Sequence, residues 1–158
     1  MAMPKTLITK AAHLLILRKQ SQAFNNPTNA TIKHLAKRKL TTLAHINRKV
    51  VVIATTQPEI NRQLVLVQRF DKTEKPFKVI INPEIIAKTE ALYTLVEGCL
   101  SIPAIREKVT RPCSETVKFP DTTGNTMSES VNGYTALIFQ HEIGHLNGIL
   151  FTDRLTIP

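Results

Sequence analysis

The sequence has few of the features that mark several large classes of protein. Its two cysteines, Cys99 and Cys113, are too few for a disulfide framework, so we expect a reducing compartment, most simply the cytoplasm. No apolar run approaches the roughly 20 residues of a membrane-spanning helix, so we expect no membrane partner. Internal repeats, low-complexity tracts and an obvious linker are absent. The 158 residues, 42% of them apolar, predict a single domain, 1–158, with one hydrophobic core.

Acidic residues are missing from positions 1–49, although the whole chain carries a net charge of +9. This basic segment allows three interpretations. It can contact RNA, such as the surface of a ribosome. It can be a transit peptide that directs the chain to an organelle, since such peptides are also basic and poor in acidic residues. It can also be a solvated face that only aids solubility. Aromatic residues do not alternate with the basic ones as they do in single-strand binders, and we expect no DNA partner.

What is present is a series of short strands between two helices. Apolar residues at 32, 35, 36, 40 and 43 recur at helical spacing, and Asn29 or Thr31 can cap this first helix. Runs of strand length and composition follow at residues 50–53, 64–67, 77–81, 91–96, 108–111 and 115–119, with a turn at 121–125. Consecutive short strands favour antiparallel pairing, because parallel strands need a crossover between them. A late helix is expected at 134–146. The predicted class is α+β: an N-terminal helix, a mostly antiparallel sheet, and a late helix packed on it.

The late helix carries His141-Glu142-Ile143-Gly144-His145, the pattern H-E-x-x-H. Residues four apart lie on one helical face, so both imidazoles can reach one metal ion. Glu142 lies beside the first ligand, where its carboxylate can take a proton from a water molecule at the metal. The alternative is two partly buried histidines next to a surface glutamate. The pattern predicts a metal but leaves the reaction open.

The third ligand is expected upstream of the helix. Asp153 is the only carboxylate after His145 and is expected in a turn, and Phe151 stands where one class of zinc peptidase has a third histidine. Three upstream histidines lie in the basic segment: His13, His34 and His45. Cys99 instead follows a predicted strand, and a metal readily deprotonates a thiol. Two histidines and a cysteine leave a fourth position open, as a catalytic site requires. Taken alone, Cys99 would be read as a small buried apolar residue.

Two motifs in this order resemble those of the peptide deformylase family. They are Glu97-Gly98-Cys99-Leu100-Ser101 and Gln140-His141-Glu142-Ile143-Gly144-His145-Leu146-Asn147-Gly148. The resemblance covers the chain from about residue 32 to residue 155. It implies Cys99, His141 and His145 as ligands of one divalent metal ion, and Glu142 as general acid and base. The ion would be Fe²⁺ in vivo, and the softness of the donors also allows Zn²⁺, Ni²⁺ or Co²⁺.

The same resemblance implies how a substrate is bound and hydrolysed. The reaction would remove the N-formyl group from formyl-methionine at the N-terminus of nascent proteins. The side chain of Gln57 and the backbone N–H of Leu100 would stabilise the oxyanion that forms at the formyl group. A methionine pocket and a peptide-binding cleft would include Val51, Val52, Glu97, Gly98, Arg106, Tyr134, Leu137 and Ile138.

Some features depart from the family pattern. Val50 and Val52 stand where the family has glycines, along a segment that pairs with the bound peptide, and their side chains can narrow that cleft. Gly144 stands where the family has an aspartate, which removes one candidate partner of Arg111. The sequence also stops short of the basic C-terminal helix of bacterial members. Three alternatives follow: a hydrolase of another N-acyl amide, a zinc endopeptidase, or a non-catalytic basic module that keeps the metal-binding fold.

Overall fold

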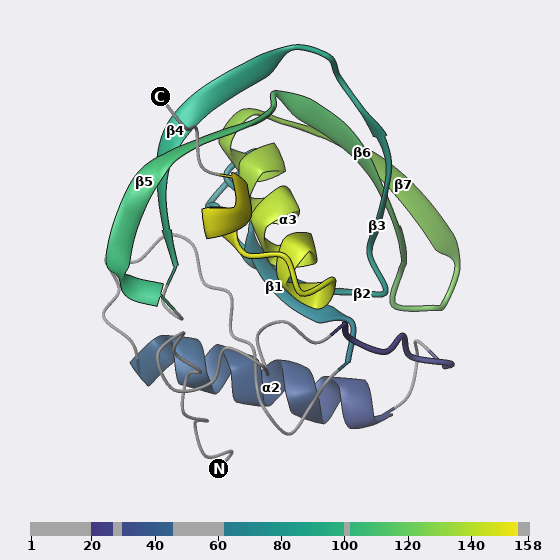
Figure 1. Ribbon diagram of the computed structural model, residues 1–158. Helices are drawn as coiled ribbons and strands as arrows, with labels where there is room; N and C mark the ends of the chain where they lie inside the picture. The colour runs from purple at the N-terminus through teal and green to yellow at the C-terminus, as the bar shows by residue number, and fades with distance from the viewer. Residues whose placement is uncertain (1–19, 27–29, 46–61, 100–101, 155–158) are drawn as a thin grey trace.

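The computed structural model describes residues 20–26, 30–45, 62–99 and 102–154. Within these ranges the elements in chain order are α2 (Ala30–His45), β1 (Leu64–Gln68), β2 (Phe77–Ile81), β3 (Glu84–Lys88), β4 (Leu92–Cys99), β5 (Ile102–Pro112), β6 (Ser114–Pro120), β7 (Thr126–Asn132), α3 (Gly133–Leu146) and the 3₁₀ helix η1 (Phe151–Arg154). Figure 1 shows α3 at the centre, with β4 and β5 on one side, β3, β6 and β7 on the other, and α2 beyond β1. No helix in the described ranges is both long and apolar enough to cross a membrane.

The named strands pair in an antiparallel sense throughout. Strand β1 pairs with β2, β4 pairs with β5, and β3, β6 and β7 form a three-stranded sheet in that order of pairing. In the β4–β5 ribbon the register shifts between Gly98 and Cys99, at the end of β4 that faces α3. The predicted α+β architecture, with a mostly antiparallel sheet around a late helix, is confirmed.

Strand β1 is buried on both faces because it lies between the two helices. Leu64 packs with Ile32 and Leu35 of α2, whereas Val65 and Val67 belong to the main core against α3. A strand that is covered on both faces needs a continuous apolar run rather than an alternating one. This requirement explains the sequence of β1, and it places α3 behind a rigid apolar layer.

Most predicted elements are present, but two strands were not foreseen. Strand β7 is largely polar and exposed, with Val131 as its buried residue, and β3 pairs irregularly with β6. Both strands therefore lack the clear alternation that would have revealed them. Helix α2 begins at Ala30, so Thr31 lies inside the helix and is not its cap. Asn29 and the strand expected at 50–53 lie outside the described residues.

Candidate metal centre

Helix α3 is anchored at both of its ends. At the start, Gly133 has φ +60°, a conformation that disfavours a side chain, and its carbonyl accepts a hydrogen bond from the Tyr93 hydroxyl. At the end, the backbone N–H groups of Asn147 and Ile149 both donate to the Gly144 carbonyl, at 3.0 and 2.8 Å. Nearly all residues between these anchors are buried. The helix therefore holds its side chains in a defined orientation within the core.

Three buried donor atoms converge beside α3. The Nε2 atoms of His141 and His145 lie 3.3 Å apart, and the Sγ atom of Cys99 lies 3.4 Å from Nε2 of His145. All three side chains offer a donor atom within 4.8 Å of the other two. The histidines come from one face of α3, and Cys99 comes from the last position of β4. The structure thus brings together the three residues that the sequence predicted as ligands.

The chemistry of this donor set fits a divalent metal ion. Two imidazole nitrogens and a thiolate suit iron, cobalt, nickel and zinc. Three protein ligands leave a further position for water or substrate, as in catalytic sites. Burial lowers the pKa of His141 against the opposing effect of Glu97, so its ring is neutral and can act as a ligand.

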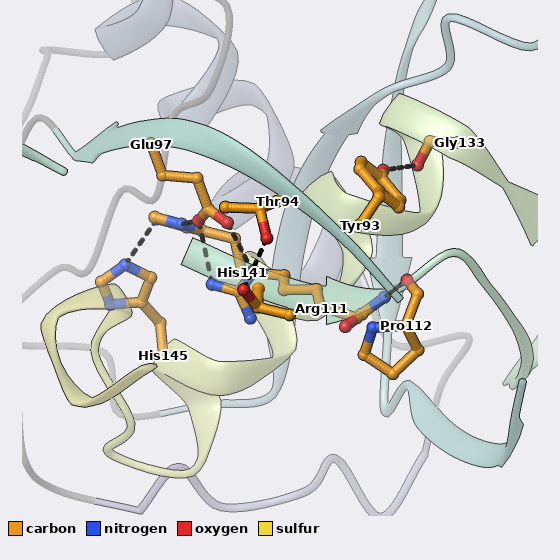
Figure 2. A network of polar contacts seen from close by, with 10 residues as sticks. Tyr93, Thr94, Glu97, Arg111, Pro112, Gly133, His141 and His145 are labelled. Carbon is orange, nitrogen blue, oxygen red and sulfur yellow. Dashed lines mark hydrogen bonds and ion pairs between the residues drawn. The ribbon is translucent and has the colours of Figure 1, made fainter. Parts of the chain in front are cut away.

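A carboxylate behind His141 orients its ring (Figure 2). Oε1 of Glu97 lies 3.0 Å from Nδ1 of His141. Because an ionised carboxylate only accepts hydrogen bonds, Nδ1 carries the proton and donates it, which leaves the Nε2 lone pair for a metal. Burial acts to raise the pKa of Glu97, but hydrogen bonds from His141 and Arg111 outweigh burial and hold this pKa below its ordinary value. Glu97 is therefore ionised at neutral pH.

Arg111 holds Glu97 in a bidentate ion pair inside the protein (Figure 2). Its Nε donates to Oε2 of Glu97 at 2.6 Å, and one terminal nitrogen donates to Oε1 at 2.9 Å. The two side chains are only 2% and 3% exposed. A bidentate pair fixes the carboxylate plane as well as its position. Arg111 thus has a carboxylate partner even though Gly144 replaces the aspartate of the family pattern.

Residues beyond the end of α3 complete the surroundings of the ligands. The ring of Phe151 on η1 stacks on the imidazole of His141, with a centroid separation of 6.0 Å and an interplanar angle of 20°. Oδ2 of Asp153 accepts a hydrogen bond from the Leu150 N–H at 3.0 Å, so Asp153 serves in a turn, as expected. Glu142, next to the first ligand, is 2% exposed. Glu142 and the three predicted ligands therefore share one buried region.

The residues of α3 predicted to line the methionine pocket differ in exposure. Leu137 and Ile138 are each 1% exposed, whereas Tyr134, one turn earlier, is 38% exposed. The Tyr134 ring lies edge-on to Phe70 at a centroid distance of 5.1 Å. The helix thus presents two packed apolar side chains and one accessible aromatic ring.

The remaining predicted substrate residues lie at the end of the β4–β5 ribbon or outside the described ranges. Arg106 is exposed on β5 and is the register partner of Gly98. A side chain at Gly98 would meet Cγ of Arg106 at 3.4 Å, so the glycine leaves room for the arginine stem. Five predicted or variant positions lie outside the described residues: Val50, Val51, Val52, Gln57 and Leu100.

Sequence reasoning did not identify three contributors to this site. The hydrogen bond from His141 to Glu97 could have been inferred from spacing, since Glu97 and Cys99 are two residues apart and share a face of β4. The stacking of Phe151 and the contact of Phe70 with Tyr134 had no such signal, because both depend on how segments distant in sequence pack together.

Comparisons with known proteins agree with this geometry. Residues 5–157 match the polypeptide deformylase family. A peptide deformylase from Synechocystis sp. is 38% identical over 129 residues, which cover 81% of this chain and 68% of that relative. The crystal structure of peptide deformylase from Thermotoga maritima superposes with a TM-score of 0.84 at 28% identity, covering 98% of this chain and 99% of that one. The Met-Ala-Ser-bound enzyme from Acinetobacter baumannii gives a TM-score of 0.83 at 28% identity, covering 98% and 100%. The chain therefore belongs to the polypeptide deformylase family, whose metal-dependent removal of N-formyl groups from nascent peptides is the function that its motifs predicted.

Proposed function

We propose that Cys99, His141 and His145 hold one divalent metal ion in this deformylase, and that Glu142 transfers the proton in its reaction. The observation that carries the proposal is the convergence of three buried donor atoms, all within 4.8 Å of one another, next to a buried carboxylate. Fe²⁺ is the proposed ion in vivo, with Zn²⁺, Ni²⁺ and Co²⁺ as substitutes that the same donors accept. When bound, the ion supplies a Lewis acid that polarises a carbonyl oxygen and makes water more acidic.

Glu142 acts first as general base and then as general acid. Its carboxylate takes a proton from the water that attacks the formyl carbon, and returns it to the amine nitrogen as the C–N bond breaks. The products are formate and a peptide with a free amino terminus. The Gln57 side chain and the Leu100 N–H are proposed to stabilise negative charge on the formyl oxygen during the attack.

Glu97 and Arg111 act by positioning rather than by touching the substrate. Their bidentate pair keeps the carboxylate against Nδ1 of His141, which fixes the ring orientation and its tautomer. We therefore assign Glu97 to the support of the metal ligand rather than to the substrate-binding role first expected for it. Phe151, stacked on the same ring, shields the ligand from water.

The substrate is proposed to be the formyl-methionyl end of a nascent peptide. Tyr134, Leu137 and Ile138 would form an apolar wall for the methionine side chain together with Val51. Val52 and Gly98 would lie along the peptide, and the exposed Arg106 would anchor its backbone. The chemistry of these residues suits that substrate, because a methionine side chain needs apolar surroundings and a peptide backbone needs polar partners.

We infer a single catalytic domain over residues 1–158, located in the cytoplasm or in an organelle. The basic first third is proposed to contact the ribosome surface, where nascent peptides emerge. The exposed Lys33 and Lys37 on α2 belong to this basic segment and support such a contact through their charge.

The test is formate release from formyl-Met-Ala-Ser by protein purified without oxygen and reloaded with Fe²⁺, Ni²⁺ or Zn²⁺. Glu142→Ala should keep the bound metal but lose turnover by about 10²–10⁴-fold, the usual contribution of a positioned acid–base group. Glu129→Gln is the matched control, because Glu129 pairs with Arg69, outside the ligand set. Turnover by Glu142→Ala at the wild-type rate would overturn the assignment. A preference for acetyl-Met-Ala-Ser would instead favour the alternative, a hydrolase of another N-acyl amide.

A further inference from the structure

The outer wall of the proposed methionine pocket is an aromatic ring that is only partly packed. Tyr134, Ile138 and His141 follow one another at spacings of four and three residues, so they share the face of α3 that carries the histidine ligands. Ile138 is 1% exposed and is fixed by its packing, whereas Tyr134 is 38% exposed. A partly exposed aromatic side chain keeps several rotamers unless a neighbour restricts it. The orientation of the Tyr134 ring therefore depends on what lies against it.

Phe70, in the loop between β1 and β2, lies against this ring. The ring centroids of Phe70 and Tyr134 are 5.1 Å apart, and the rings meet edge to face at 61°. Aromatic pairs prefer this arrangement because the positive edge of one ring meets the negative face of the other. Phe70 is itself partly buried and packs on the main core. The Tyr134 ring is thus held by a side chain from a distant segment of the chain.

The residue before Phe70 ties the loop to α3. Nε and one terminal nitrogen of Arg69 donate to the two carboxylate oxygens of Asp71, at 2.9 and 2.7 Å. The same guanidinium lies 5.6 Å from the ring centroid of Phe139 on α3, and the Arg69 side chain is only 4% exposed. The Arg69 backbone N–H donates to the Pro76 carbonyl at 2.8 Å, which closes the loop. Phe70 therefore stands between two paired residues, in a loop held against the helix that carries Tyr134.

The far end of the same loop has an unusual backbone conformation. Glu74 and Lys75 both have positive φ, at 65° and 48°. Residues other than glycine rarely adopt this left-handed conformation, and they keep it where their surroundings impose it, often beside functional sites. Lys75 places its ammonium nitrogen over the Phe70 ring, 5.8 Å from the centroid, where the ring attracts a cation. The strained turn thus adds a second contact to the ring that holds Tyr134.

We propose that the β1–β2 loop, residues 69–76, determines specificity at the methionine pocket, with Phe70 as the positioning residue that holds the Tyr134 ring as the outer wall. This inference rests on the proposed function, because it takes Tyr134 to line that pocket. With its ring held, Tyr134 closes the pocket around a long apolar side chain of the first substrate residue. Without Phe70 the ring turns towards solvent, and the pocket keeps only its inner wall of Leu137 and Ile138.

The loss of Phe70 should fall on substrate binding rather than on proton transfer. The wall contacts a side chain that does not change during the reaction, so it stabilises the bound substrate and the transition state equally. Phe70→Leu should therefore raise KM for formyl-Met-Ala-Ser about 3- to 10-fold, the range of one aromatic pair, and leave kcat within about 2-fold. Formyl-Ala-Ala-Ser has a first side chain too short to reach the outer wall, so its kcat/KM should change little. The preference for methionine over alanine should fall by the same factor as KM rises.

The experiment measures kcat/KM for both peptides in metal-loaded wild type, Phe70→Leu, Tyr134→Leu and the double variant. Because Phe70 acts through Tyr134, Phe70→Leu should lower the methionine preference of wild type and have no further effect once Tyr134 is replaced. Phe70→Tyr keeps the ring and should keep the preference. Phe24→Leu is the matched control: Phe24 is also partly buried, with Arg62 over its ring at 5.8 Å, but it packs on the α2 side of β1. An unchanged preference in Phe70→Leu, or an equal loss in both backgrounds, would overturn the proposal.

The Tyr134 ring can also be followed without turnover. The chain has two tyrosines, so ¹³C-labelled tyrosine gives few ring signals, and Tyr134→Leu identifies those of Tyr134. Phe70→Leu should move these signals, because it removes a ring current, and the product Met-Ala-Ser should move them in wild type. If Phe70→Leu does not fold, the peptide titration decides, since Tyr134 signals that ignore Met-Ala-Ser would refute the wall. Signals that respond to both changes without formate release would support the wall and refute the reaction, whereas turnover with an unchanged methionine preference in Phe70→Leu would do the opposite.

Discussion

Replacing Glu115 by glutamine should make the free energy of unfolding less dependent on pH. The folded-state pKa of this carboxyl is about 8, raised by burial from an ordinary value of 4.5. Between these two values the unfolded chain is ionised at this position while the folded chain keeps its proton. The folded state therefore binds more protons than the unfolded state, and stability from this group must fall as the pH rises. This sign is opposite to that of a carboxylate held in an ion pair.

The magnitude follows from proton linkage. Each pH unit inside the window lowers the free energy of unfolding by about 1.4 kcal/mol, because one proton is released on unfolding. From about pH 5.5 to about pH 7.5 wild type should lose about 3 kcal/mol through Glu115. Glutamine has the same shape and no proton to lose, and its buried amide resembles the neutral carboxylic acid in polarity. The stability difference between the variant and wild type should therefore widen by the same about 3 kcal/mol across this range.

Urea denaturation at a series of pH values, with identical metal loading for both proteins, measures this difference directly. The pH dependence of all other groups is common to both proteins and cancels in the comparison. A difference that stays constant to within about 0.5 kcal/mol across this range would refute the reasoning, because it would mean that Glu115 is ionised in the folded protein.

Two further substitutions probe the remaining buried charges. Arg111→Met removes the cation from its pair with Glu97 and should lower the free energy of unfolding by about 3–5 kcal/mol, since it leaves a carboxylate uncompensated in the core; urea denaturation provides the check, and an unchanged free energy of unfolding would contradict it. Asp71→Asn removes an ion pair in which the hydrogen bond from Arg69 lowers the Asp71 pKa below its ordinary value of 3.8. Its cost, about 1 kcal/mol at neutral pH for this partly exposed group, should shrink as the pH falls through that lowered pKa, and equal costs at about pH 2 and neutral pH would contradict it.

The clustering of the proposed ligands was predictable from sequence because their arrangement is mainly local. His141 and His145 lie four residues apart, and the helical repeat alone places them on one face. Cys99 required more, and it was identified by the glycine and predicted strand before it and by a family resemblance. The late helix itself was evident from its apolar spacing. These features depend little on how the surrounding strands pack, which is why they could be predicted from the sequence.

The strands around the site were less predictable because their pattern is weak. Strand β7 exposes most of its residues, and β3 shifts register within its pairing with β6. A strand that buries one side chain carries little periodicity, so only its partners identify it. The bidentate pair of Arg111 with Glu97 belongs to the same class of feature, since the register that brings the β4 and β5 residues together is set by the fold as a whole.

Glu115 lies between these two cases. The alternation of β6 was visible in the sequence, and it assigns the same face to positions 115, 117 and 119. Because Val117 and Phe119 must face the core, the sequence already implied an inward-facing carboxyl group at Glu115. The absence of a hydrogen-bond partner for this carboxyl group among the described residues was not implied, because it depends on how the neighbouring elements pack. A polar residue on the apolar face of an alternating strand is thus a signal that sequence can provide, while the surroundings of its side chain must come from the structure.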